Sequence, residues 1–206
     1  MGTFTSLHGK IIGFDSETGQ LIQAGNLPNN GLANGATVKA LEQGGPVLHA
    51  TRLRLTATPI TITDDAGVAQ YGGVKVYDFP AGAIVIEGAV VTGLLTAGVT
   101  GTITDTWGGG VALGTATATT GATLTGTEAD IMPEVNIAAA TAKVGTIDAV
   151  SVATALTESV SRVFDGTATA IDMYLNFVID DSATHTSGSA TFTGVIDFQW
   201  RLIADN

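Results

Sequence analysis

Three stretches of the chain alternate between apolar and polar residues with a period of two. This spacing is typical of β-strands, in which successive side chains point to opposite faces of the sheet. In the first stretch, residues 47–55, we expect Arg52 and Arg54 to share one face with Thr56. The side chains expected on the opposite face are Val47, His49, Thr51, Leu53 and Leu55.

The other two stretches, residues 171–179 and 192–202, carry the clearest alternation. The apolar positions are Ile171, Met173, Leu175, Phe177 and Ile179 in one, and Phe192, Ile196, Phe198, Trp200 and Leu202 in the other. We therefore predict two long strands joined as a hairpin through a polar loop, with Trp200 in the core. On the opposite face of the first of these strands we place Asp172, Tyr174, Asn176 and Val178.

Proline, glycine and aspartate mark where the strands are expected to stop. Pro59 should end or bend the first strand, Asp64–Gly67 should form a turn, and Phe79–Gly82 should separate two strands. After this break, Ile84–Ile86 is expected to be a strand buried on both faces.

Two segments are less regular. The run of Gly, Ala, Thr and Val at residues 108–127 predicts one or two exposed strands joined by a glycine turn. Residues 152–164 fit a helical stripe that ends at Asp165–Gly166, and they fit a strand nearly as well.

These strands and turns predict an all-β fold, for which our first choice is a jelly-roll-like antiparallel β-sandwich with at most one short helix. We assign residues 46–206 to this sandwich. Residues 1–45, rich in Gly and Asn between positions 25 and 35, are expected to be an N-terminal arm that orders against a partner or a simple leading hairpin.

Charge and composition restrict the classes of molecule that we expect the chain to bind. The 206-residue chain has 8 Lys and Arg against 19 Asp and Glu, for a net charge of −11, and it has no Cys. Phosphate binding requires clustered cations, and only Arg52 and Arg54 lie close together. We therefore expect no direct nucleic-acid binding. The N-terminus does not have the basic residues followed by an apolar run that are typical of a signal peptide, so we expect none. We also expect no membrane partner.

Residues for catalysis or metal binding form no known motif, so we expect no enzyme, no catalytic residue, no cofactor and no metal. His8, His49 and His185 are scattered. Asp180 and Asp181 lie near His185, but they lack the spacing of a calcium loop and suit a solvated hairpin loop better. We assign the neighbouring carboxylates at 64–65 and 180–181 to turns rather than to acid–base chemistry.

In its general features the chain resembles head decoration (cement) proteins of tailed bacteriophages with a jelly-roll body. The segments that carry this resemblance are residues 25–35, Asp78–Gly82, Asp165–Thr169, Tyr174–Phe177 and Thr193–Trp200. The resemblance implies a homotrimer on the capsid exterior that binds the major capsid protein and stabilises the shell. It also implies that residues 1–45 are the attachment arm, in a virion protein made in the host cytoplasm.

A second hypothesis is a tail or head-fibre module that recognises host surface glycan. Aromatic side chains that stack on sugars would carry this function, and Trp107 and Tyr71 are the candidates. Packing is the preferred role for Trp107, which we place at the end of a strand beside three glycines.

Overall fold

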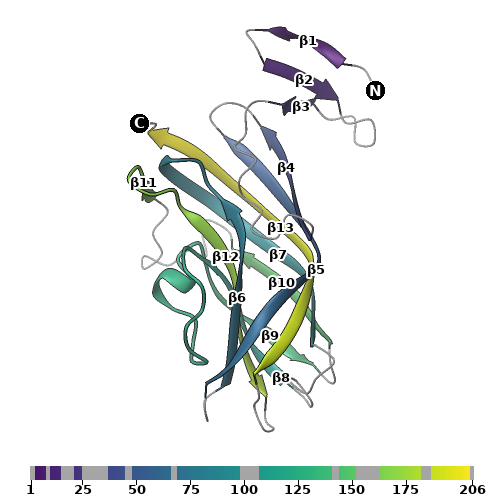
Figure 1. Ribbon diagram of the computed structural model, residues 1–206, viewed down its shortest axis with the longest axis vertical. Coiled ribbons are helices and arrows are strands. Elements are labelled where there is room, and N and C mark those ends of the chain that lie inside the picture. Colours follow the sequence, from purple (N-terminus) through teal and green to yellow (C-terminus); the bar gives the residue numbers. More distant parts are fainter. Residues whose placement is uncertain are drawn as a thin grey trace.

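The structure is a computed structural model that describes residues 3–7, 10–14, 21–24, 37–44, 48–65, 69–97, 107–140, 144–151, 163–181 and 187–204. These residues form an all-β, antiparallel fold, as the alternating pattern predicts (Figure 1). The strands are β1 (Thr3–Leu7), β2 (Lys10–Phe14), β3 (Leu21–Ala24), β4 (Val38–Gly44), β5 (His49–Asp65), β6 (Ala69–Asp78), β7 (Gly82–Ala97), β8 (Trp107–Gly114), β9 (Met132–Ala140), β10 (Val144–Ser151), β11 (Val163–Gly166), β12 (Asp172–Asp181) and β13 (Gly188–Ala204). A 3₁₀ helix, η1 (Gly126–Glu128), is the one helical element among the described residues.

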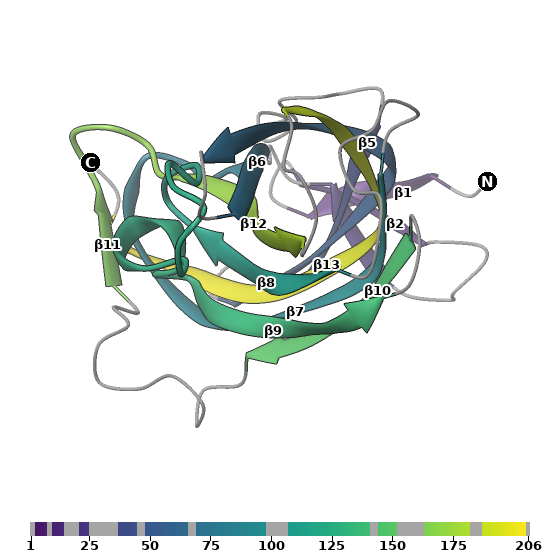
Figure 2. The same ribbon diagram turned by 90° about the horizontal axis from the view of Figure 1, so that it is seen from below.

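Ten of the strands form one sheet, here called the main sheet, in the order β10-β7-β13-β5-β6-β12-β8-β9, with β4 beside β5 and β11 beside β7. The pairs are nested: β5–β6 lies at the centre, with β13 and β12, then β7 and β8, then β10 and β9 outside it. Such an order is typical of Greek-key and jelly-roll folds. The sheet curls until the end strands β9 and β10 contact each other (Figure 2). Its inner face therefore encloses the core, as in a sandwich.

The remaining strands, β1, β2 and β3, form a separate three-stranded sheet, here called the N-terminal sheet. It lies beyond the end of the main sheet, next to β4 (Figure 1). Strand β4 belongs to the main sheet, because Val38–Gly44 pairs with residues 49–55 of β5, and the Val38 side chain is fully buried.

Within the described residues, which do not include Val47, the predicted faces of the alternating stretches are confirmed, with His49, Ile171 and Leu202 half-buried. On β12, Met173, Leu175, Phe177 and Ile179 are fully buried, and on β13 Phe192, Ile196, Phe198 and Trp200 are buried. Trp200 is 1% exposed, donates from Nε1 to Thr51 Oγ1 at 3.0 Å, and stacks on His49 at 4.1 Å. Each large side chain buried in this way contributes roughly 1.5–3 kcal/mol of hydrophobic free energy.

The predicted hairpin between these two strands is wrong. β12 pairs with β6 and β8, whereas β13 pairs with β5 and β7. The nested order separates the two strands by the β5–β6 pair. Alternation reports which side of a strand is buried, but it does not report which strand lies beside it.

Pro59 does not end its strand, because β5 continues to Asp65. The alternation changes phase two residues earlier, where Ala57 has a positive φ of 47° and the pairing with β13 shifts register. This β-bulge turns Thr58, Ile60 and Ile62 inward after Leu55. Pro59 lies where β5 is paired with β13 but with neither β4 nor β6, so its missing N–H costs little.

Other expectations have mixed outcomes. The break at Phe79–Gly82 is confirmed, and Ile84, Val85 and Ile86 are buried as predicted. Of the possible helix, residues 152–162 lie outside the described residues, while Val163 and Phe164 belong to β11. Trp107 begins β8 rather than ending a strand.

Candidate functional site: the outer groove and the charged face

Residues 115–131, between β8 and β9, lie against the outer face of the main sheet and are here called the outer segment. They include η1, which projects on one side of the sheet in Figure 1. Asn176, fully buried on β12, holds the segment in place. Its Oδ1 accepts from Ala118 N at 2.9 Å, and its Nδ2 donates to the carbonyls of Ala116 and Glu128, both at 2.8 Å. One side-chain amide thus satisfies three backbone groups of the segment.

Small residues on β6 and β8 give the outer segment room to approach the sheet. A Cβ at Gly73 would collide with Asn176 Oδ1 and lie 2.5 Å from Thr117 Oγ1, and one at Gly114 would collide with the backbone of Thr127 and Glu128. A second, smaller cluster fills the space between segment and sheet. Its members are Ala69, Ala112, Ala118, Leu124, Ala129 and Val178, with Tyr71 packed against them.

The expectation of exposed strands at residues 108–127 is therefore wrong. Residues 110–114 of β8 are buried, and the residues after Gly114 form the cover over the outer face rather than another strand. Gly110 and Gly114 of β8 allow close packing beneath this cover, whereas most of residues 117–127 are exposed.

Carboxylate side chains accept hydrogen bonds from N–H and O–H groups of the outer segment. Asp130 accepts from Thr115 N at 2.8 Å and from Thr115 Oγ1 at 2.7 Å. Further backbone N–H groups donate to three other carboxylates: Thr119 to Glu128, Gly121 to Asp65, and Leu124 to Glu134. Burial raises the pKa of Asp130, because lost hydration outweighs the bonds from Thr115.

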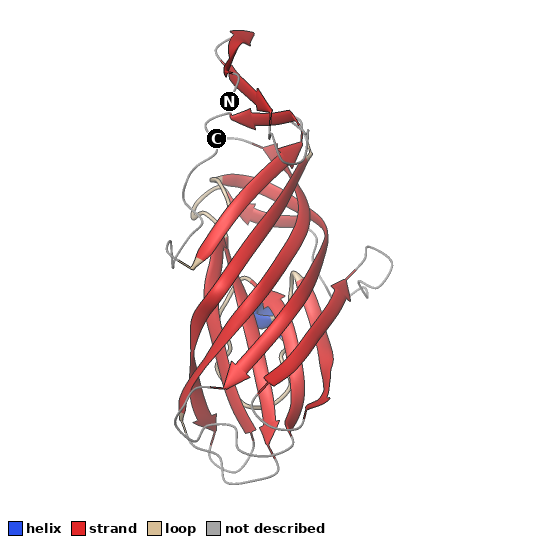
Figure 3. Ribbon diagram, turned by 90° about the vertical axis from the view of Figure 1, so that its right-hand side faces the viewer, coloured by secondary structure: helices blue, strands red, loops and turns tan. Residues whose placement is uncertain are grey.

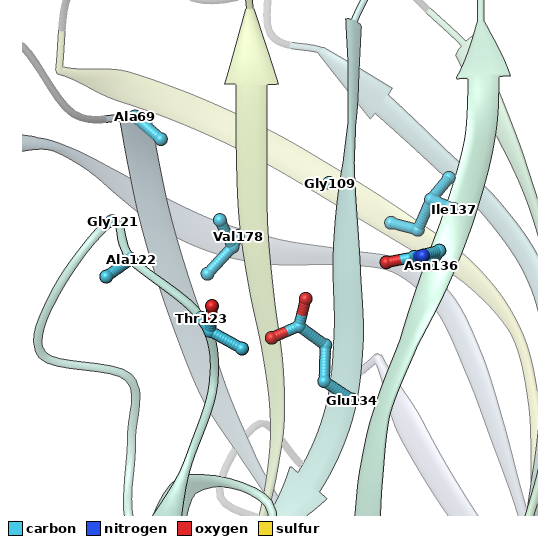
Figure 4. A pocket seen from close by; sticks show the side chains of 9 residues that line it. All are labelled: Ala69, Gly109, Gly121, Ala122, Thr123, Glu134, Asn136, Ile137 and Val178. Atoms are coloured by element: carbon cyan, nitrogen blue, oxygen red, sulfur yellow. The ribbon is translucent and has the colours of Figure 1, made fainter.

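An open groove of about 470 Å³ lies between the outer segment and strands β8, β9 and β12 (Figure 4). Glu134 and Asn136 of β9 border it on one side and Thr123 of the outer segment on the other, with Val178 at its base. The Glu134 side chain packs directly against Gly110, and a Cβ at position 110 would collide with it. The residues that line the groove include one carboxylate and no Lys or Arg, so the groove is anionic.

A different arrangement occupies the outer face of β4, β5, β13 and β7, here called the charged face. Arg52 donates to both carboxylate oxygens of Asp197, at 2.7 and 2.9 Å, and Arg201 pairs with Glu87 at 2.8 Å. Hydrogen bonding to Asp197 raises the pKa of Arg52. Lys39 and Arg54 lie directly opposite each other across β4 and β5, and both are exposed.

One further charged cluster joins β6 and β12. Asp78 and Asp172 are cross-strand partners, and Lys75 forms an ion pair with both. Burial, with a hydrogen bond shared with Asp172, raises the pKa of Asp78. Burial also opposes ionisation of Asp172, but bonds to Asp78 and Lys75 outweigh it and lower the pKa. The two carboxylates share Lys75 as their cation, and these contacts connect β6 to β12.

The residues singled out from the sequence do not converge on one site. The side chains of Asp180, Asp181, His185 and Trp107 lie outside the described residues, and Tyr71 is half-buried in the outer cluster. Asp64 and Asp65 belong to β5, and Asp65 accepts the Gly121 N–H at 2.7 Å; residues 66–68, which include the rest of the predicted turn, lie outside the described residues. In the part of the chain that the structure describes, no group of three or more His, Asp and Glu could hold a metal ion.

Sequence reasoning missed Glu134, Asn136 and the anchoring role of Asn176. The polar face of β12 was predicted to include Asn176, but a polar position on a strand is ordinarily solvated. Glu134 and Asn136 alternate with buried Ile137 and half-buried Val135, and this pattern was the available signal.

Comparisons with protein-family models, curated proteins and solved structures find no match for this chain. Within the described residues, no helix has the length and apolar character needed to span a membrane.

Proposed function

We propose that this protein is a structural virion component, a capsid decoration protein that binds the outside of a phage head and bridges major capsid subunits. The observation that carries this proposal is the presence of two distinct elements in one chain: the N-terminal sheet and the curled main sheet beyond which it lies (Figure 1). A bridging protein needs two contact regions, and in this proposal the N-terminal sheet and the main sheet are those regions.

The surface chemistry is consistent with a protein partner. Charged residues make up 13% of the chain, and the net charge is −11. Covering a sheet with few charges removes little hydration, and the cores of protein interfaces are depleted in charge. The acidic balance keeps the protein away from packaged nucleic acid.

Attachment can be tested with a variant that lacks residues 1–36. This cut removes β1, β2 and β3 but retains β4, whose Val38 is part of the core. The variant should fold and melt like the full chain, and it should bind heads at least about tenfold more weakly in a co-sedimentation assay, since a whole contact element is lost. The first requirement is that mass spectrometry of purified particles detects the chain.

A matched control replaces Asn136 by Ala on the exposed rim of the groove and keeps the N-terminal sheet. It should bind heads normally. Equal binding by the full chain and the truncated variant would show that the N-terminal sheet is not the attachment element.

The glycan hypothesis gains no specific contact from the described residues. Tyr71, one of its two candidates, contributes to packing beneath the outer segment. We therefore develop only the shell-binding proposal.

A further inference from the structure

Lys39 and Arg54 form a like-charge pair that the fold of one chain does not explain. They face each other across β4 and β5, where opposed like charges are destabilising. Among the described residues no carboxylate pairs with either of them, whereas Arg52, two positions along the same face, is neutralised by Asp197. The chain has 8 Lys and Arg, and two of them lie opposite each other with no counter-ion among the described residues.

The outer groove has the opposite property. Its carboxylate, Glu134, accepts one backbone N–H from Leu124, and no Lys or Arg is among the residues that line the groove. The nearby carboxylates of Asp65, Glu128 and Asp130 also accept from N–H or O–H groups of the outer segment rather than from cations. A guanidinium or ammonium group entering the groove would meet Glu134 together with the Asn136 amide and the Thr123 hydroxyl (Figure 4).

The groove is also preformed. Glu134 is fixed by Leu124, and the outer segment opposite is fixed by Asn176. A fixed carboxylate loses little freedom when a cation binds, which favours affinity.

These two features lie on different sides of the molecule and cannot meet within one chain. In Figure 3 the strands seen from the β5 side lie in front, and the helix η1 of the outer segment lies behind them. We infer that Arg54 and Lys39 of one copy dock in the groove beside Glu134 of a second copy. The contact is heterologous, so its repetition builds a ring or an open chain of copies.

This inference does not depend on the proposed function, because self-association is measured on the purified protein without shells. Sedimentation velocity across a concentration series should show assembly of the full chain that weakens as salt is raised. The variant with both Lys39→Gln and Arg54→Gln, and separately Glu134→Gln, should each weaken assembly about tenfold or more. Glu134→Gln retains an oxygen for the Leu124 N–H, so the groove keeps its shape.

Two matched controls separate the contact from a general effect of charge. Arg52→Gln removes one cation from the same face, and Glu87→Gln removes one carboxylate, but each takes a residue that already has an internal partner. Both should leave the association constant within about twofold, since a charge paired within its own copy has little left for a neighbour.

Mixing the two impaired variants gives the sharpest test. The Lys39→Gln/Arg54→Gln protein keeps its groove, and the Glu134→Gln protein keeps its cations, so the mixture should form a one-to-one complex that does not grow. A full chain that stays monomeric at all concentrations would overturn the inference. So would controls that act like the test variants, or a mixture that stays monomeric.

Discussion

Two regions of the outer face of the main sheet differ in what covers them. On the face formed by β6, β12 and β8, the chain lays its own outer segment over small residues, anchored by Asn176. The charged face of β4, β5, β13 and β7 carries cross-strand charges and exposed Leu94, and within the described residues no segment lies over it. A face built from Gly and Ala admits backbone, whereas a face built from long charged side chains remains available for solvent or another molecule.

The largest effect of a single substitution on the outer face should come from Asn176→Ala. It leaves the Ala118 N–H and the Ala116 and Glu128 carbonyls without their partner. We expect a loss of about 2–4 kcal/mol in the free energy of unfolding, measured by urea denaturation. The control, Asn136→Ala on the exposed rim, should change stability by less than about 0.5 kcal/mol. Equal effects would mean that the outer segment contributes no more than a surface loop.

A second substitution tests the close approach without removing a hydrogen-bonding group. Gly73→Ala places a methyl group against Asn176 and Thr117, so the outer segment has to move away. We expect a loss of about 1–3 kcal/mol in the unfolding free energy. Gly108→Ala is the matched control, because its Cβ would lie 3.9 Å from the nearest atom, the Ile137 carbonyl oxygen. Similar stability of both variants would contradict the tight contact at Gly73.

The smallest effect is expected on the charged face. Arg52→Gln breaks a two-pronged ion pair with Asp197, but the two side chains are 50% and 40% exposed. Solvent screens such a pair, so we expect a loss below about 1 kcal/mol that shrinks further in high salt. A loss as large as that of Asn176→Ala would show that the charged face contributes to folding as much as the covered face does.

The sequence predicts the inward and outward sides of strands far better than it predicts their neighbours. Hydrophobic alternation located the buried faces of β12 and β13, because burial acts on each strand separately. The pairing of these strands depends on contacts with β5, β6, β7 and β8, which are distant in sequence. The bulge at Ala57 also went unpredicted, because alanine has no intrinsic preference for a positive φ.

The groove could be foreseen only in part. Residues 108–127 have a composition that fits exposed turns as well as close backbone packing, and the choice depends on the surface beneath them. That surface is supplied by Gly73, Asn176 and Val178, which lie on other strands. The division of the chain at residue 45 stays a prediction, although β4 pairs within the main sheet.

The position of β13 has a consequence for synthesis of the protein. This strand, the last along the chain, lies between β5 and β7, and it supplies Phe192, Phe198 and Trp200 to the core. The ribosome therefore releases β5 and β7 long before the strand that joins them exists. Until residues 188–204 emerge, both strands expose edges that can pair with other chains, which is a hazard during slow β-sheet folding. The growing polypeptide has to remain unaggregated from the synthesis of β5 until that of β13, and the acidic balance of the chain serves this need by mutual repulsion.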